Sequence, residues 1–225
     1  MNKQNQEMRD IILLSVLPHV VFEGWNRAAV KAGINDLEHI PEIDFDAYKR
    51  VFPGDMVDMA KHFSDWTDRQ MVSKIDEKDL SNLKVRERIA FSVMSRLKIL
   101  TPHREAVRYF LSYLSLPQNA GTGLTCSYQT VSEIWFAIGD ESADFNFYTK
   151  RALLAPVLGA TTLYWLADEC DSDGDFPDTW AFLDRRIEDV LGLFKARVRL
   201  TKILKQINDP FSTCKRIIST IGANG

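Results

Sequence analysis

Apolar residues recur along this chain with a spacing near 3.6, the period of a helix that buries one face. No stretch alternates strictly between apolar and polar positions, so the pattern predicts an all-α protein. In the first expected helix Gly24 ends the helix, and the predicted buried face is Ile11, Leu14, Leu17, Pro18 and Val21. Expected helices cover about residues 7–22, 26–31, 45–51, 53–73, 85–100, 124–138, 143–169 and 177–193, with another beginning at Pro102 and a loop at 117–123.

The first part of the chain has the order of a helix-turn-helix: short helix, turn with glycine, short helix, then a long helix. The charge of this part of the chain does not favour DNA binding. Residues 1–60 hold six Lys or Arg and ten Asp or Glu, and residues 34–46 hold five acids and no Lys or Arg. Because affinity for duplex DNA depends largely on cations that displace counterions, we expect no nucleic-acid partner.

The composition is that of a soluble globular protein, with 45% apolar residues and a net charge of -3. The three cysteines have no CxxC spacing, which favours free thiols in a reducing compartment. The N-terminus has neither a signal-peptide nor a transit-peptide pattern. The longest uncharged apolar run, residues 152–167, is shorter than the roughly 20 residues that cross a bilayer, so no spanning helix is expected.

A pair of cations marks the central helices. Lys150 and Arg151 are the only Lys or Arg residues in 110–183, and they precede a segment that is apolar nearly all round. In that segment Pro156 removes a backbone donor, and Gly159 leaves little side-chain volume. Such residues fit either close helix packing or a cavity. Arg151 could pair with Asp140, Glu141 or Asp144, or with the phosphate of a lipid.

The end of the chain is basic and amphipathic. Residues 195–216 hold seven Lys or Arg and a single acid, while apolar residues recur at helical spacing. A helix of this kind can lie at an anionic membrane surface or pack on the domain with its charges solvated.

The sequence contains no recognisable catalytic or metal-binding motif. The four histidines stand singly and fit surface or capping positions, and no HExxH, nucleophile elbow or P-loop is present. The aspartates at 171, 173 and 175 alternate like a calcium loop, but the glutamate at its twelfth position is missing. We therefore predict no catalytic residues, no metal site and no cofactor.

Two ordered blocks carry a family resemblance. Residues 144–151 read DFNFYTKR, and residues 178–190 read DTWAFLDRRIEDV, with LPQN at 116–119 as a looser match. They resemble the ubiquinone-biosynthesis accessory proteins, the ninth of the Coq series, whose fold is similar to that of TetR-family regulators. The resemblance covers about residues 85–193 well. It implies a TetR-like bundle with a degenerate helix-turn-helix subdomain at 1–75, a lipid-binding and dimerisation domain at 76–194 and a membrane-contacting tail at 195–225.

The resemblance also implies a non-enzymatic function. Family members bind isoprenoid lipids and phospholipids, present quinone intermediates to the demethoxyubiquinone hydroxylase, form homodimers, have lost DNA binding and touch the membrane with a C-terminal amphipathic helix. It implies a cytoplasmic protein peripheral to the inner membrane in bacteria, and the matrix side of the mitochondrial inner membrane in organellar relatives.

Candidate residues follow from the resemblance together with the charge and size pattern. Phe147 departs from the tryptophan expected there, losing an indole donor but keeping the aromatic bulk. The expected lipid-binding residues are Arg151, Trp135, Leu154, Leu158, Thr161, Trp165 and Phe110; the partner-binding residues are Asp144, Phe147 and Tyr148; and the membrane-binding residues are Lys202, Ile203, Ile207, Phe211, Lys215 and Ile218.

Two alternative functions stay open at the level of sequence. A TetR-like transcriptional regulator that senses an apolar effector would share the same helix order. A small helical enzyme acting on quinone intermediates is the other, although the sequence offers it no catalytic constellation.

Overall fold

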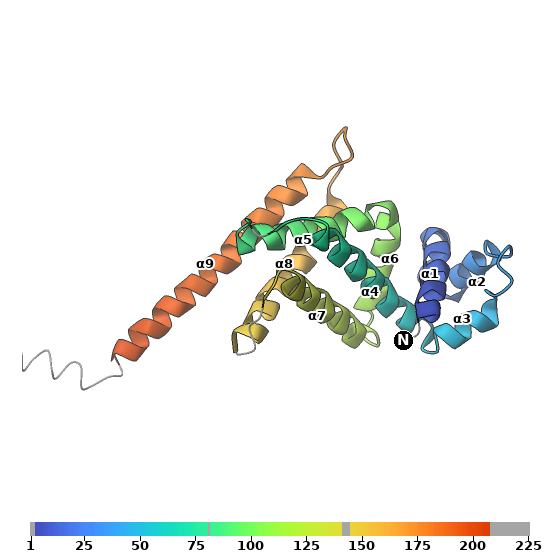
Figure 1. Ribbon diagram of the computed structural model, residues 1–225, viewed down its shortest axis with the longest axis horizontal. Coiled ribbons are helices and arrows are strands. Elements are labelled where there is room, and N and C mark those ends of the chain that lie inside the picture. The colour runs from blue at the N-terminus through green and yellow to red at the C-terminus, as the bar shows by residue number, and fades with distance from the viewer. Residues whose placement is uncertain (1–2, 81, 141–144, 208–225) are drawn as a thin grey trace, which may run out of the picture. The chain divides into compact units, whose positions relative to one another are not determined.

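The computed structural model describes residues 3–80, 82–140 and 145–207, and every regular element in those ranges is helical (Figure 1). The all-α prediction is therefore confirmed. The helices are α1 (Lys3–Glu23), α2 (Arg27–Asn35), α3 (Phe45–Val51), α4 (Asp55–Asp76), α5 (Val85–Leu100), the 3-10 turn η1 (Thr101–His103), α6 (Arg104–Ser115), α7 (Ala120–Ala137), α8 (Phe145–Ala167) and α9 (Pro177–Ile207).

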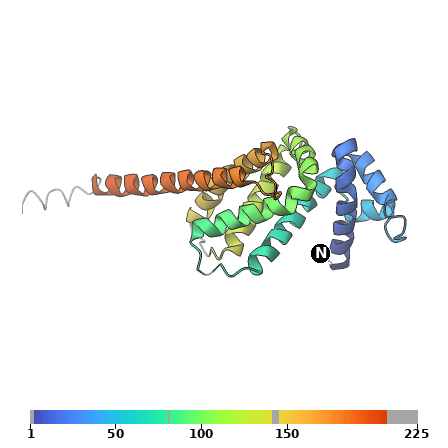
Figure 2. The ribbon, with the colours of Figure 1, turned by 90° about the horizontal axis from the view of Figure 1, so that it is seen from above.

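The chain divides into two compact units, residues 1–183 and 184–225, and α9 runs from the first into the second. The first unit contains α1 to α8 and the start of α9. Within it, α4 packs along both α5 and α7, and α7 packs along α8 (Figure 2). No helix in the described ranges has the length and apolar content that a membrane crossing needs.

One predicted loop is only partly right. Of the expected loop at 117–123, residues 117–119 form a turn, but α7 begins at Ala120 and includes Gly121 and Gly123. The cost of glycine in a helix is about 1 kcal/mol, which packing can override. At Gly123 an added Cβ would lie 3.5 Å from the Leu114 side chain, an ordinary van der Waals distance, so α7 packs against α6 there.

The first three helices form a group around α1. Asn26 and Asp44 cap α2 and α3 by accepting hydrogen bonds from backbone N–H groups in the first turn. The predicted end of α1 at Gly24 is confirmed, since this residue has φ +80°. An added Cβ at Gly33 would lie 2.8 Å from the Val16 backbone, so α2 approaches α1 closely there.

The predicted buried face of α1 is wrong. Ile11 and Leu14 are 40% and 39% exposed, and only Leu17 of the predicted face is among the buried residues of the helix. Because α1 contacts α2, α3, α4 and α6, its buried surface is set by several neighbours and does not follow a single narrow stripe. The buried residues are Ile12, Leu13, Val16, Leu17 and Val20.

A polar network joins α1 to α4. Asp10 of α1 lies 2.8 Å from both His62 Nε2 and Arg69 Nη2 of α4. His62 is 2% exposed, so the expectation that every histidine lies at the surface or caps a helix is wrong for this residue. Burial, followed by the nearby Arg9 charge, lowers the pKa of His62 to about 4 despite the opposing effect of Asp10.

Two arginines fix the end of α8. Arg104 Nη2 of α6 donates to the carbonyl oxygens of Trp165 and Asp168, and Arg108 Nη2 donates to that of Leu166. The last carbonyls of a helix have no partner within the helix, so these bonds satisfy groups that would otherwise need water. The Asp168 carboxylate in turn accepts from the Thr179 N–H at 3.0 Å.

We predict that His62 makes the stability of the protein pH-dependent. The unfolded chain takes up the proton below about pH 6.5, whereas the folded chain does so only near 4. Stability that is fully present above pH 6.5 is therefore lost as the pH falls toward 4, by on the order of 3 kcal/mol. Urea denaturation between pH 7 and 4.5 measures this loss. His62→Gln should flatten it, and His39→Gln, at an exposed position, should not.

Candidate ligand-binding cavity

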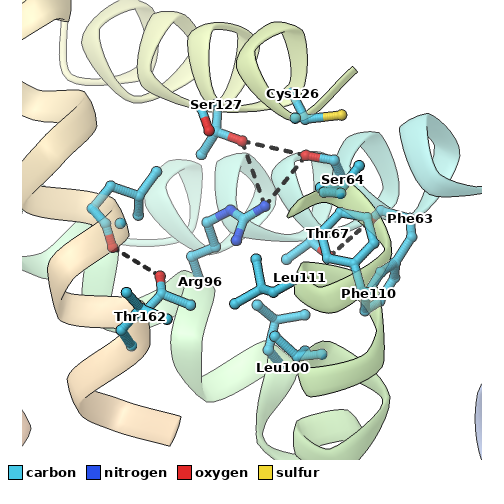
Figure 3. Close-up of a pocket in the computed structure, with 17 residues that line it drawn as sticks. Phe63, Ser64, Thr67, Arg96, Leu100, Phe110, Leu111, Cys126, Ser127 and Thr162 are labelled. Carbon is cyan, nitrogen blue, oxygen red and sulfur yellow. Dashed lines mark hydrogen bonds between the residues drawn. The ribbon is translucent and has the colours of Figure 1, made fainter. Parts of the chain in front are cut away.

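The first unit contains a cavity of about 230 Å³, walled by α4, α5, α6, α7 and α8 (Figure 3). An apolar cavity of about 150 Å³ accommodates benzene, so this one has room for a substituted ring or about two isoprene units. Its apolar lining residues are Phe63, Leu100, Val107, Phe110, Leu111, Leu114, Leu158 and Leu163; the others are Ser64, Thr67, Arg96, Gly123, Cys126, Ser127, Thr130, Gly159 and Thr162.

The cavity opens between α7 and α8. Among its lining residues, Ser127 and Gly159 are exposed, and Leu163 has 63% of its surface exposed. Phe63 and Thr130 are each 1% exposed and mark the closed end. An added Cβ at Gly159 would meet nothing within 4 Å, so this side of the wall is open.

A buried ion pair lies at the closed end. Arg96 Nε of α5 donates to Asp68 Oδ1 of α4 at 2.8 Å, and Thr130 Oγ1 of α7 donates to Asp68 Oδ2 at 2.8 Å. Arg96 Nη2 lies 3.4 Å from the hydroxyl oxygens of Ser64 and Thr130. In Figure 3 the guanidinium points toward Ser64. Arg96 is the only charged residue among those that line the cavity.

Asp68 also lines a separate cleft with Asp65, Arg69 and Glu133, in which Arg69 pairs with Asp65 at 3.0 Å. Burial raises the pKa of Asp68, while the charge of Arg96 and the bonds from Arg96 and Thr130 act against that rise. Burial and the neighbouring carboxylates of Asp68 and Asp65 also raise the pKa of Glu133. The closed end of the cavity therefore holds one cation, Arg96, whose charge is compensated by Asp68.

Two of the seven predicted lipid-binding residues, Phe110 and Leu158, line the cavity. The other five are buried but belong to other parts of the first unit's interior. They are Arg151, Trp135, Leu154, Thr161 and Trp165.

The predicted cation pair has polar contacts of its own. Arg151 Nε donates to Ser132 Oγ at 3.0 Å, and the residue has further partners. Asp140, one of the acids offered as a partner for Arg151, accepts from Lys150 Nζ at 2.5 Å, and it too has further partners. Lys150 also lies over the Trp135 ring, 5.2 Å from its centroid. The phosphate role of Arg151 stays a prediction.

The sequence reasoning missed Arg96. Its signal was its position, since it falls on the apolar side of the expected helix at 85–100 together with Ile89, Val93 and Leu97. A charged residue on the buried face of a helix needs a partner of opposite charge. Asp68, on the buried face of α4, is that partner.

The predicted partner and membrane residues are only partly described. Tyr148 is 65% exposed on α8, and Phe147 lies in the same helix. Asp144 falls outside the described residues, as do Phe211, Lys215 and Ile218. Lys202, Ile203 and Ile207 belong to α9 in the second unit.

Comparison with known proteins supports the family resemblance. Residues 120–193 match the family model described as COQ9. The chain is 31% identical over 198 residues to the rat protein "Ubiquinone biosynthesis protein COQ9, mitochondrial" and 29% identical to the human protein of the same name. Each alignment covers 85% of this chain, and 61% and 60% of those proteins. The chain thus spans about three-fifths of the length of these curated relatives, and its resemblance to the COQ9 proteins is confirmed.

A solved structure supports the fold. The TetR transcriptional regulator from Nitrosomonas europaea aligns with a TM-score of 0.63 at 18% sequence identity, covering 82% of this chain and 98% of that chain. The TetR-like fold predicted from the resemblance is therefore confirmed. At this identity the similarity concerns the fold alone.

We expect Arg96→Met to lower the free energy of unfolding by about 3–5 kcal/mol, because it leaves the Asp68 carboxylate buried without its counter-charge. Adding Asp68→Leu should recover most of the loss, since a well-packed apolar pair often replaces a buried ion pair at little cost. Urea denaturation of the two variants and the wild type measures both effects. A single variant as stable as the wild type would show that the pair is not needed for folding.

Proposed function

We propose that this relative of the COQ9 proteins takes part in ubiquinone biosynthesis by binding the apolar part of an isoprenoid lipid or phospholipid in the cavity between α4 and α8. The observation that carries the proposal is an apolar cavity that opens to the surface beside Gly159 and Leu163. Ligand cavities are typically apolar with a few placed polar groups, and this lining has that composition.

The dimensions favour partial burial of a long ligand. A space of about 230 Å³ holds only about two isoprene units, so the remainder of a longer chain leaves through the opening. Leu163 on α8 and Leu124 on α7 are 63% and 74% exposed, and these two helices pack together. Their apolar surfaces can cover the portion of the ligand that lies outside.

The proposed role is binding without catalysis. Cys126 is the thiol that lines the cavity, and burial raises its pKa, whereas a nucleophilic cysteine needs a lowered pKa. Within the described residues no group of three His, Cys, Asp or Glu side chains is placed to hold a metal ion. An activity of the purified protein on quinone intermediates without added hydroxylase would favour the enzyme alternative.

We further propose that the protein presents its ligand to the demethoxyubiquinone hydroxylase through Asp144, Phe147 and Tyr148. The exposure of the Tyr148 ring supports this, because exposed aromatic side chains are common anchors at interfaces. We also propose that the protein forms a homodimer and lies peripherally at the inner membrane. Its basic tail, including Lys202, Ile203 and Ile207, would contact the anionic lipid surface.

The regulator alternative has less support from the α1–α3 group. Two of the cations there already have carboxylate partners, because Arg27 pairs with Asp55 and Lys49 lies 3.3 Å from Asp46. Binding to duplex DNA from its own promoter at physiological salt, weakening steeply as salt rises, would favour a regulator over the proposed function.

Obstruction of the cavity provides the direct test. Gly159→Leu should reduce the lipid that co-purifies with the protein several-fold, because the new side chain occupies the open wall. Gly121→Leu is a matched control: an added Cβ there also meets nothing within 4 Å, but Gly121 does not line the cavity. Both changes replace glycine within a helix, so neither should lower helix stability.

Native mass spectrometry of protein purified under mild conditions measures the bound lipid. An empty wild-type protein, or equal lipid in the two leucine variants, would contradict the proposed binding in this cavity. Arg151→Ala in the same assay tests the phosphate prediction, which fails if lipid uptake is unchanged. In cells, deletion of the gene should cause demethoxyubiquinone to accumulate, and a normal quinone pool would count against the link to the hydroxylase.

A further inference from the structure

We propose that the closed end of the cavity, formed by Arg96, Ser64 and Thr130, selects a neutral oxygen-bearing head, a carbonyl or hydroxyl group attached to an apolar body, in preference to a phosphate. This inference rests on the proposed binding function and adds to it which chemical group is bound at the closed end and in which direction the ligand lies.

Arg96 has hydrogen-bonding capacity to spare. A guanidinium carries five N–H donors, and Asp68 takes the one on Nε at 2.8 Å. The two contacts of Nη2, to Ser64 and Thr130, are 3.4 Å long, beyond the usual 2.7–3.2 Å range of an N–H···O bond. Because Arg96 lines the cavity, a ligand oxygen at the closed end could accept a stronger bond than these hydroxyl groups do.

The charge of the site favours a neutral acceptor. Asp68 already compensates the guanidinium, and both side chains are almost completely buried, with relative exposures of 10% for Arg96 and 5% for Asp68. In the neighbouring cleft Asp65 is paired with Arg69, while Glu133 adds a further carboxyl group. A phosphate at the closed end would therefore meet one cation whose charge Asp68 already compensates. A carbonyl or hydroxyl oxygen needs no counter-charge and still gains a hydrogen bond from a charged donor.

The shape of the cavity sets the orientation. Ser64, Thr130 and Arg96 are buried, with 4%, 1% and 8% of their surfaces exposed, whereas Gly159, Leu163 and Ser127 are exposed at the opening. A ligand therefore binds with its oxygen-bearing head inward and its hydrocarbon chain outward. This is the reverse of a lipid whose charged head stays at the surface.

The experiment measures binding of three probes with closely similar hydrocarbon bodies to the full-length, delipidated protein: geraniol, geranyl monophosphate and the hydrocarbon myrcene. Titration calorimetry or displacement of a fluorescent probe gives each Kd. We expect geraniol to bind about tenfold or more tightly than either of the others, as a hydrogen bond to a charged group allows. In Arg96→Met/Asp68→Leu, geraniol and myrcene should bind with closely similar affinity.

Two further variants keep the test decisive. Lys98→Met removes a cation two positions away on α5 that pairs with Asp175 and does not line the cavity, so it should keep the preference for geraniol. Arg96→Lys keeps a charge beside Asp68 but withdraws the planar donor array, so the preference should fall even if the double variant does not fold.

The outcomes separate this inference from the proposed function. Tighter binding of geranyl monophosphate than of geraniol would overturn the inference and make Arg96 an anion site. Equal binding of all three probes, with loss of binding in Gly159→Leu, would overturn the inference and support the proposed function. If none of the probes binds to the wild-type protein, both fail.

Discussion

The Asp68–Arg96 ion pair is the interaction on which the centre of the first unit depends. It joins α4 to α5, and the Thr130 hydroxyl brings α7 into the same cluster. Two buried charges of this kind must stay together, because a single one left without its partner would be strongly unfavourable. The pair therefore fixes the relative positions of three of the five helices that enclose the cavity, and it supplies the polar group at its closed end.

Most of the helices could be predicted from the sequence, because apolar periodicity and local breakers define them. The expected segments at 45–51 and 85–100 coincide with α3 and α5. The packing between helices was harder to predict from the sequence. The buried face of α1 depends on several neighbouring helices, which leave no trace in the local pattern. The glycines at 121 and 123 are typical of a loop, yet α7 begins at Ala120 and includes both.

The candidate site was predicted in outline only. Apolar residues around Gly159 pointed to the correct helix, and Phe110 and Leu158 do line the cavity. The charged group at its wall was expected at Arg151 because that cation stands isolated in the sequence. Arg151 is buried, as its isolation suggested, but it does not line this cavity. Arg96, which has charged residues close by in the sequence, is the one whose position on the inner face of α5 brings it to the cavity. Tertiary partners such as Asp68 lie 28 residues away, where sequence spacing gives no guide.

All the residues that line the cavity lie between Phe63 and Leu163, within the first unit, and α8 is held at its end by Arg104 and Arg108. The basic amphipathic segment belongs to the other unit. In the proposed function, the lipid cavity and the membrane-contacting tail therefore belong to separate stretches of polypeptide, so substitutions that change the affinity of the tail for a surface would leave the lining of the cavity unchanged.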